Sequence, residues 1–219
     1  MSQKSRFERA IEFIDQQGIL LVFPVKNQKD ADSLWARFHP RTPLRWEWTD
    51  DGDDKVFQMW HLMKELSDCE QVVYSKWYQG RATYFSRELF QALYFLTMQN
   101  SELFESPPDA YEDLMEVLTE SSPLSTKELK KHTDLRGKDC AAIYNRGMKW
   151  AFTRFLIVGY GEEEDGSFPS LKVAKTDLIY EDLVSSSEKL NPQKALEIVN
   201  KYMPQGSAFR KFLFRNLKI

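Results

Sequence analysis

The chain has 219 residues, of which 42% are hydrophobic and 29% charged, with a formal net charge of −3. This is the composition of an ordinary water-soluble globular protein. No apolar run approaches the roughly 20 residues of a membrane helix, so we expect no membrane span. The N-terminal residues lack an apolar stretch after a basic region, which argues against a secretory signal. Cys69 and Cys140 lie far apart, which favours a reducing cytoplasm over a disulfide framework.

The net charge changes sign along the chain. Residues 1–124 carry a net charge of −8, residues 125–175 carry +3 and residues 176–219 carry +2. A polyanion would therefore meet the second half of the protein. The alternative is that these charges only form solvated faces, and the small totals leave that alternative open.

The first hundred residues predict a mixed α and β domain. Ser5 and Glu8 stand three residues apart in the order of a capping box, which predicts a helix start, and Gly18 is suited to end that helix. The patterns that follow predict a buried strand over 19–23, a helix over 30–38, a helix from an acidic turn at 50–54 to residue 66, a strand over 71–78, its partner over 82–85, and a helix from Ser86 to Met98.

A linker is expected over residues 101–108, because this stretch contains two prolines and no apolar periodicity. It would divide the chain into a domain over residues 1–100 and a second unit over 109–175. Residues 176–219 would form C-terminal helices.

The sequence pattern of the second unit predicts a winged helix–turn–helix. Apolar residues at helical spacing from Tyr111 to Leu118 indicate a first helix, and Ser125 with Glu128 forms a second capping box that starts a short helix. A longer helix over 138–154 precedes two strands, over 155–160 and 171–174, around a polar turn. Three helices and a hairpin in this order are typical of the winged-helix fold. The fold class is therefore α+β, with tandem winged-helix-like units, mainly helical, with small β-hairpins.

The positive charges on one face of the third helix of this unit predict contact with nucleic acid. Lys138, Arg146 and Lys149 fall on one side of the helical wheel, opposite an apolar face that can pack on the other two helices. Asn145 lies beside these cations and is able to bond an adenine edge. Lys130 and Lys131 of the short second helix complete the candidate DNA-binding set in this unit.

Acidic residues argue against strong DNA binding. Asp139 adjoins the cationic face, and the predicted wing contains Glu162, Glu163, Glu164 and Asp165, which phosphate would repel. The alternative is a degenerate winged helix used for packing or for contact with a protein partner.

A second candidate contact lies around the turn at Gly80. Trp77 and Arg81 flank this turn, and an aromatic ring beside a cation is able to stack on an exposed base. The favoured alternative is that Trp77 belongs to the core and that Arg81 pairs with a carboxylate. The three histidines are isolated and no phosphate-binding glycine loop is present, so we expect no metal and no cofactor.

Several stretches, taken in order, resemble the AlkZ/YcaQ group of bacterial DNA glycosylases, which are built from winged-helix domains. The likeness is closer to the short AlkZ-related proteins of unassigned function. No single motif is specific, and the order of the segments carries the resemblance. The segments are Gly18–Val25, Ser33–Arg37, Gly80–Ser86, Pro123–Leu129 and Phe155–Gly159.

The resemblance implies DNA repair only if the catalytic motif is retained. The glycosylases carry Gln-x-Gln or Gln-x-Asp, with an apolar middle residue, just after the segment that matches Gly18–Leu21, and those side chains activate a water. The matching positions here are Val22-Phe23-Pro24-Val25, and Gln28-Lys29-Asp30 is displaced with a charged middle residue. We therefore expect a non-catalytic, nucleic-acid-associated protein. A protein-interaction module and a divergent glycosylase remain the alternatives.

Overall fold

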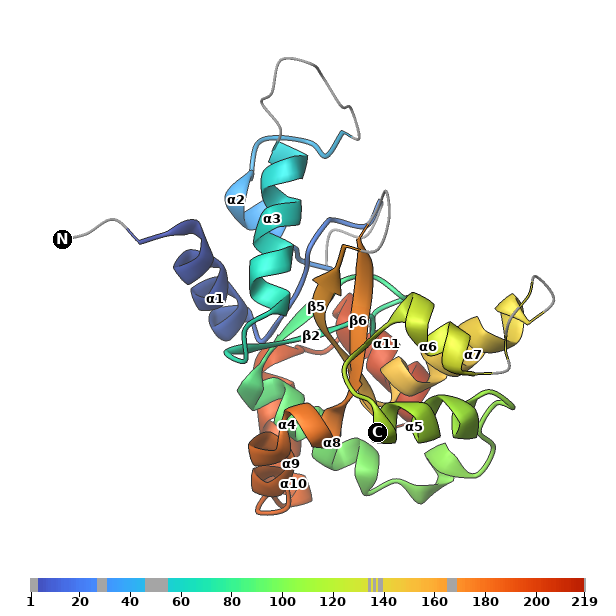
Figure 1. Ribbon diagram of the computed structural model, residues 1–219. Coiled ribbons are helices and arrows are strands. Elements are labelled where there is room, and N and C mark those ends of the chain that lie inside the picture. The colour runs from blue at the N-terminus through green and yellow to red at the C-terminus, as the bar shows by residue number, and fades with distance from the viewer. Residues whose placement is uncertain are drawn as a thin grey trace.

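The computed structural model describes residues 4–26, 31–45, 55–133, 135, 137, 140–164 and 169–218. Within this part of the chain, six strands form one antiparallel sheet in the order β1-β3-β2-β5-β6-β4 (Figure 1). Strands from the N-terminal and C-terminal parts of the chain therefore share one sheet. The strands are β1 (Ile19–Leu21), β2 (Val72–Ser75), β3 (Thr83–Ser86), β4 (Leu124–Ser125), β5 (Ile157–Glu163) and β6 (Ser170–Lys175).

Helices surround this sheet, so the prediction of an α+β, mainly helical protein is confirmed. Ser5 caps the first helix, accepting a hydrogen bond from the Glu8 backbone N–H at 3.1 Å while the Glu8 carboxylate accepts one from the Ser5 N–H at 2.7 Å. The helices are α1 (Arg6–Gln17), α2 (Leu34–Phe38), α3 (Lys55–Ser67), α4 (Arg87–Met98), α5 (Tyr111–Glu120), α6 (Thr126–His132), α7 (Ala141–Thr153), α8 (Thr176–Ile179), α9 (Glu181–Ser187), α10 (Pro192–Tyr202) and α11 (Ala208–Leu217).

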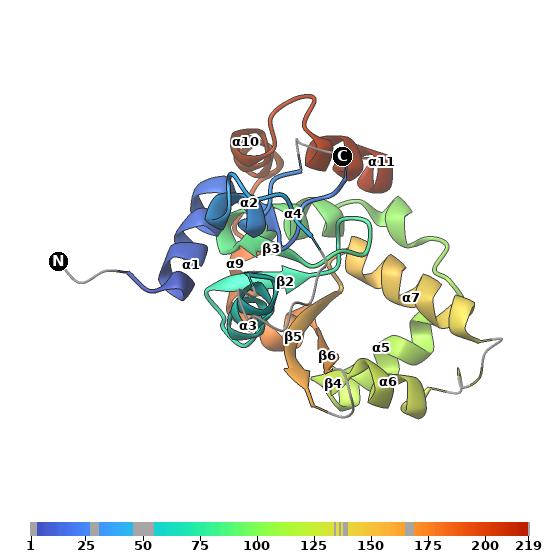
Figure 2. The same ribbon diagram turned by 90° about the horizontal axis from the view of Figure 1, so that it is seen from above.

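The sheet separates two hydrophobic cores, because successive side chains of a strand point to opposite faces. Tyr74 and Tyr84 lie in the core that contains residues of α1, α3, α5 and α7. Val73 and Phe85 lie in the other core, with residues of α4, α9, α10 and α11. Figure 2 shows α7 and α5 on one side of the molecule and α10 with α11 along another edge.

The predicted linker contacts both neighbouring parts of the chain. Its first residues form a 3₁₀ turn, Ser101–Phe104, and the Arg154 Nε donates to the Leu103 carbonyl at 2.7 Å. In the sheet, Tyr74 of β2 pairs with Gly159 of β5, which joins strands from either side of this segment. The division into units over 1–100, 109–175 and 176–219 stays a prediction.

The hairpin of β5 and β6 is longer than the sequence pattern predicts. The polar residues after Tyr160 indicate a turn, but β5 continues to Glu163 through an irregularity in its pairing with β6 between Gly159 and Glu162. Such a bulge inserts residues and bends the strand without ending it. The hairpin stands between α3 and α6 (Figure 1), and its carboxylates lie close to Lys64 of α3.

Candidate nucleic-acid interface

Close packing against α5 and α6 fixes the orientation of α7. The Tyr144 hydroxyl donates to the Thr126 carbonyl at the start of α6, at 3.0 Å. Gly147 faces α5 so closely that a Cβ there would lie 2.7 Å from Leu114 Cδ1 and 2.9 Å from Ala110 Cβ. This contact leaves Ala142, Asn145, Arg146 and Lys149 exposed on the other side of α7.

A cleft of about 490 Å³ lies between α6, α7, β6 and the turn that joins β2 to β3. Four lysines line it, and the described lining residues include no carboxylate. The side chains of Tyr144, Met148, Phe152 and Leu171 form an apolar floor. The four lysines are Lys76, Lys127, Lys130 and Lys149.

Lys76 is the functional candidate that the sequence analysis missed. It follows β2 and lies on the same side of the sheet as Tyr74, whereas Trp77 turns into the opposite core. Burial lowers the pKa of Lys76, and the charge of Glu162 acts in the opposite direction. Within the described part of the chain its amino group has no ion pair closer than 4.0 Å and no hydrogen bond. An unpaired, partly desolvated cation in a cleft marks a candidate functional site. The strand alternation around residues 72–77 is the signal that places it opposite Trp77.

The cleft brings together three of the predicted nucleic-acid-binding residues and leaves others outside it. Lys130, Asn145 and Lys149 line the cleft. Arg146 and Lys131 are exposed on α7 and α6 beyond its lining, and Lys138 lies outside the described residues.

The two candidates around Gly80 have different surroundings. Trp77 is 1% exposed; its ring stacks on Phe155 with the centroids 5.8 Å apart and meets the edge of Phe212 at 4.8 Å. This position agrees with the favoured core interpretation of Trp77. Arg81 is exposed next to Gly80, which lines the cleft, and it forms no ion pair with the carboxylates that the structure describes.

The acidic wing residues interact with neighbouring cations. Glu164 accepts from the Lys64 ammonium of α3 at 2.8 Å, and this pair lowers the pKa of Glu164 and raises that of Lys64. Glu162 is half-buried, and burial raises its pKa while Lys64 and Lys76 act to lower it. Asp165 and Asp139 lie outside the described residues. Nearby lysines of the protein therefore partly neutralise the negative charge of Glu162 and Glu164.

Residues that follow the Gly18–Leu21 segment are apolar and bonded through their backbone. The Val22 N–H donates to the Ala82 carbonyl at 3.0 Å, and the Val22 carbonyl accepts from the Trp35 N–H at 3.1 Å. Phe23 packs against the Trp35 ring with the centroids 6.1 Å apart. Gln28 and Asp30 lie outside the described residues. The segment from Val22 to Val25 offers no side chain able to activate a water.

A sequence model of the family described as AlkZ related matches residues 5–209. The chain belongs to the AlkZ-related family. The match extends over every strand of the sheet and over the cleft, and it confirms the resemblance drawn from the segment order. No curated protein and no solved structure shows a significant match.

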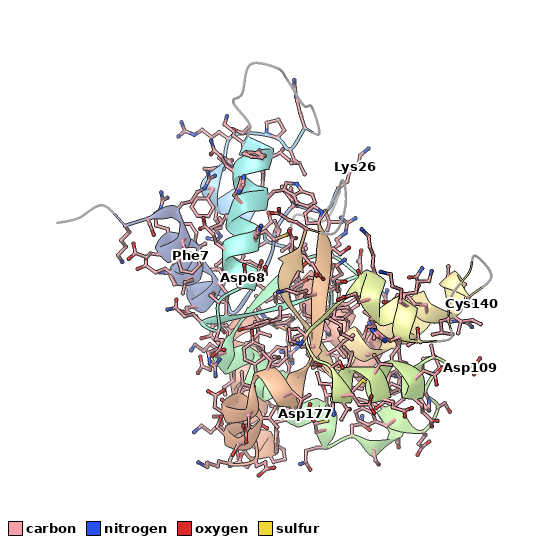
Figure 3. The ribbon with its side chains drawn as sticks, in the orientation of Figure 1. Phe7, Lys26, Asp68, Asp109, Cys140 and Asp177 are labelled. Carbon is pink, nitrogen blue, oxygen red and sulfur yellow. The ribbon has the colours of Figure 1, made fainter. Side chains whose placement is uncertain are left out.

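Two further findings bear on the chemistry of this AlkZ-related protein. In the described ranges, no helix is long and apolar enough to cross a membrane, and no three His, Cys, Asp or Glu side chains gather into a metal site. Cys69 and Cys140 are free thiols. Figure 3 shows Cys140 at the outer end of α7, far from Asp68, the chain neighbour of Cys69.

Proposed function

We propose that this AlkZ-related protein binds DNA through a winged helix–turn–helix formed by α5, α6, α7 and the β5–β6 hairpin, and that it releases no bases. Residues 1–100 form a second, winged-helix-like unit in this proposal, and the protein acts in the cytoplasm. The cleft lined by Lys76, Lys127, Lys130 and Lys149 is the observation that carries the proposal. Lysines that neutralise phosphates release bound counterions, which supplies most of the affinity of non-specific DNA binding.

The position of the acidic residues supports DNA binding over the protein-interaction alternative. That alternative rests on four carboxylates at a wing tip, where they would repel a phosphate backbone. Glu162 and Glu163 instead lie within β5, and Glu164 pairs with Lys64. The repulsion that DNA would meet is therefore smaller than four unpaired charges would produce.

Removing two exposed cations of α7 tests the proposal. We expect the double change Arg146→Ala and Lys149→Ala to weaken binding to all DNA sequences alike. It should also flatten the dependence of log K on log salt by about two units, since each lost phosphate contact removes about 0.9 units of slope. Fluorescence anisotropy of labelled DNA over a salt series measures both effects.

Lys189→Ala with Lys194→Ala is the matched control for that variant. Both lysines are exposed. Replacing them removes the same number of positive charges, but from the region of α9 and α10, away from α7 (Figure 2). The control should bind like wild type, apart from a small long-range effect of net charge. Wild type that fails to bind at low salt, or an α7 variant that binds as well as wild type, would favour the protein-interaction module.

Base release tests the non-catalytic part of the proposal. We expect no release of alkylated bases, because Phe23 and Pro24 stand where the glycosylases place a water-activating side chain. Chromatography of bases freed from alkylated DNA measures this. Turnover that disappears on changing Gln28 or Asp30 would contradict the proposal and establish a divergent glycosylase.

A further inference from the structure

We propose that the cleft between α6, α7 and the β2–β3 turn receives an unpaired nucleotide of single-stranded DNA, with the base against the apolar floor and the phosphate at Lys76. This inference rests on the proposed function, because it names the form of DNA that the same site takes. It adds Lys76 as a ligand-binding residue and assigns a place to the base as well as to the phosphate.

The shape of the site favours an unpaired nucleotide over duplex backbone. Pockets that enclose small ligands measure about 300–1,000 Å³, and this cleft measures about 490 Å³. Duplex DNA is read by a helix that projects into a groove. Here Asn145 and Lys149 of α7 form a wall of a hollow whose other walls are α6 and the β2–β3 turn. A paired base cannot enter such a hollow, whereas an unpaired one can.

The floor of the cleft suits the face of a base. Tyr144, Met148, Phe152 and Leu171 are each more than nine-tenths buried and are held by the core beneath them, so they present a preformed apolar surface. The Tyr144 hydroxyl already donates a hydrogen bond to the Thr126 carbonyl, which holds this ring of the floor in place. Asn145 is exposed at the edge of the cleft, and its amide carries both a donor and an acceptor for a base edge.

Lys76 suits the phosphate. It lines the cleft and is partly buried, and among the described residues it forms no ion pair and no hydrogen bond. Burial disfavours the charged form of this lysine, and an anion bound beside it would offset that cost. Glu162 interacts with Lys76 electrostatically but forms no ion pair with it closer than 4.0 Å, so the ammonium remains able to bind a phosphate.

The carboxylates of β5 act against a second strand. Glu162 and Glu163 of β5 pair with Leu171 and Ser170 of β6, and Leu171 belongs to the cleft floor. A duplex laid across the cleft would carry its second backbone towards the negative charge that Lys64 and Lys76 leave uncompensated on these residues, whereas a single strand can follow the lysines alone.

The test compares a labelled oligothymidylate, a duplex of the same length and deoxythymidine monophosphate. We expect the wild-type protein to bind the single strand about tenfold more tightly than the duplex, since one base contact of this kind contributes about 1–3 kcal/mol. The change Lys76→Met should reduce single-strand binding about tenfold and duplex binding by a smaller factor, because the other lysines of the cleft still contact phosphates. Thermal unfolding of the variant checks that the fold is retained.

A second variant fills the cleft without changing any charge. Ala141 lines the cleft and its neighbour Ala142 is exposed outside it. Ala141→Trp should remove the preference for the single strand and leave salt-dependent duplex binding intact. Ala142→Trp adds the same side chain at the next position of α7 and should retain the preference.

The outcomes separate the two proposals. Absence of binding to either form of DNA would overturn the proposed function itself. Equal binding of duplex and single strand, unchanged in Lys76→Met and Ala141→Trp, would overturn the inference and leave the proposed function standing. Competition by deoxythymidine monophosphate as strong as that by the oligothymidylate would overturn the assignment to a DNA strand in favour of a free nucleotide.

Discussion

Replacing Trp77 with alanine is expected to lower the free energy of unfolding by about 3–5 kcal/mol, the usual cost of removing a large aromatic side chain from a core. The indole is 1% exposed and is surrounded by other rings. It stacks on Phe155 and meets the ring edges of Phe85 and Phe212, with centroid distances of 5.8, 5.6 and 4.8 Å. These rings come from β3, α11 and the turn before β5, so the cavity left by alanine would loosen three parts of the fold. Urea unfolding followed by far-ultraviolet circular dichroism measures the change.

The same variant distinguishes the two interpretations of Trp77. A tryptophan that stacks on a base would leave the stability almost unchanged when removed and would weaken DNA binding. Arg81→Ala is the comparison, because Arg81 belongs to the same turn but is exposed. Its loss should change stability by no more than about 0.5 kcal/mol. A Trp77→Ala protein as stable as wild type would contradict the position of the indole in the core.

Local interactions made parts of this fold predictable from the sequence. Ser5 and Ser125 cap α1 and α6 as expected, because a serine side chain and the backbone N–H three residues later lie within one turn of chain. The apolar spacing of α5 and α7 also predicted their buried faces, Leu114 and Leu118 in one and Tyr144 and Ala151 in the other.

The joined sheet could not be predicted in the same way. Tyr74 and Gly159 pair across 85 residues of chain, and nothing in either local pattern specifies that partner. Strand pairing at long range depends on the packing of the whole molecule, so the residues of one hairpin do not show that it joins a larger sheet. The cleft could not be predicted for the same reason. Lys76 follows β2 and Lys149 belongs to α7, and these two segments meet only in the folded protein.

The end of β5 was predicted too early because of the local composition of the acidic wing. Glu162 and Glu163 are polar and follow two glycines, Gly159 and Gly161, which together favour a turn. In the fold, Gly161 has φ of 75° at the irregularity of β5, a conformation that glycine adopts without strain. The strand therefore continues to Glu163, and its carboxylates come within reach of Lys64 and Lys76.

Gly18→Ala is the second change with a large expected effect, because two costs coincide at this position. Gly18 ends α1 with φ of 73° and ψ of −36°, and a left-handed φ costs a residue with a Cβ about 1–2 kcal/mol. The new Cβ would also lie 2.3 Å from Tyr202 Cγ, and overpacking of this kind costs about 1–3 kcal/mol. We therefore expect the free energy of unfolding to fall by about 2–5 kcal/mol, measured by urea unfolding.

Tyr202 cannot easily move away from this contact. Its hydroxyl donates to the Glu88 carboxylate of α4, and the Lys201 ammonium lies 4.4 Å from the centre of its ring while pairing with Glu88 at 2.8 Å. The contact joins α10 to the end of α1, so a shift of the ring would disturb the packing of α10 on α4. Relaxation of the site is thus limited, which places the expected loss above that of backbone strain alone.

Gly80→Ala isolates the backbone contribution, because Gly80 has the same φ of 73° and a Cβ there would meet no atom within 4 Å. This control should lose about 1–2 kcal/mol, and the excess loss in Gly18→Ala then measures the clash with Tyr202. A double-mutant cycle gives an independent check. In a Tyr202→Ala background the ring is absent, so Gly18→Ala should cost no more than the Gly80 control. An equal cost of Gly18→Ala in both backgrounds would show that the loss arises from the backbone alone, and that the contact between α10 and the end of α1 tolerates a methyl group.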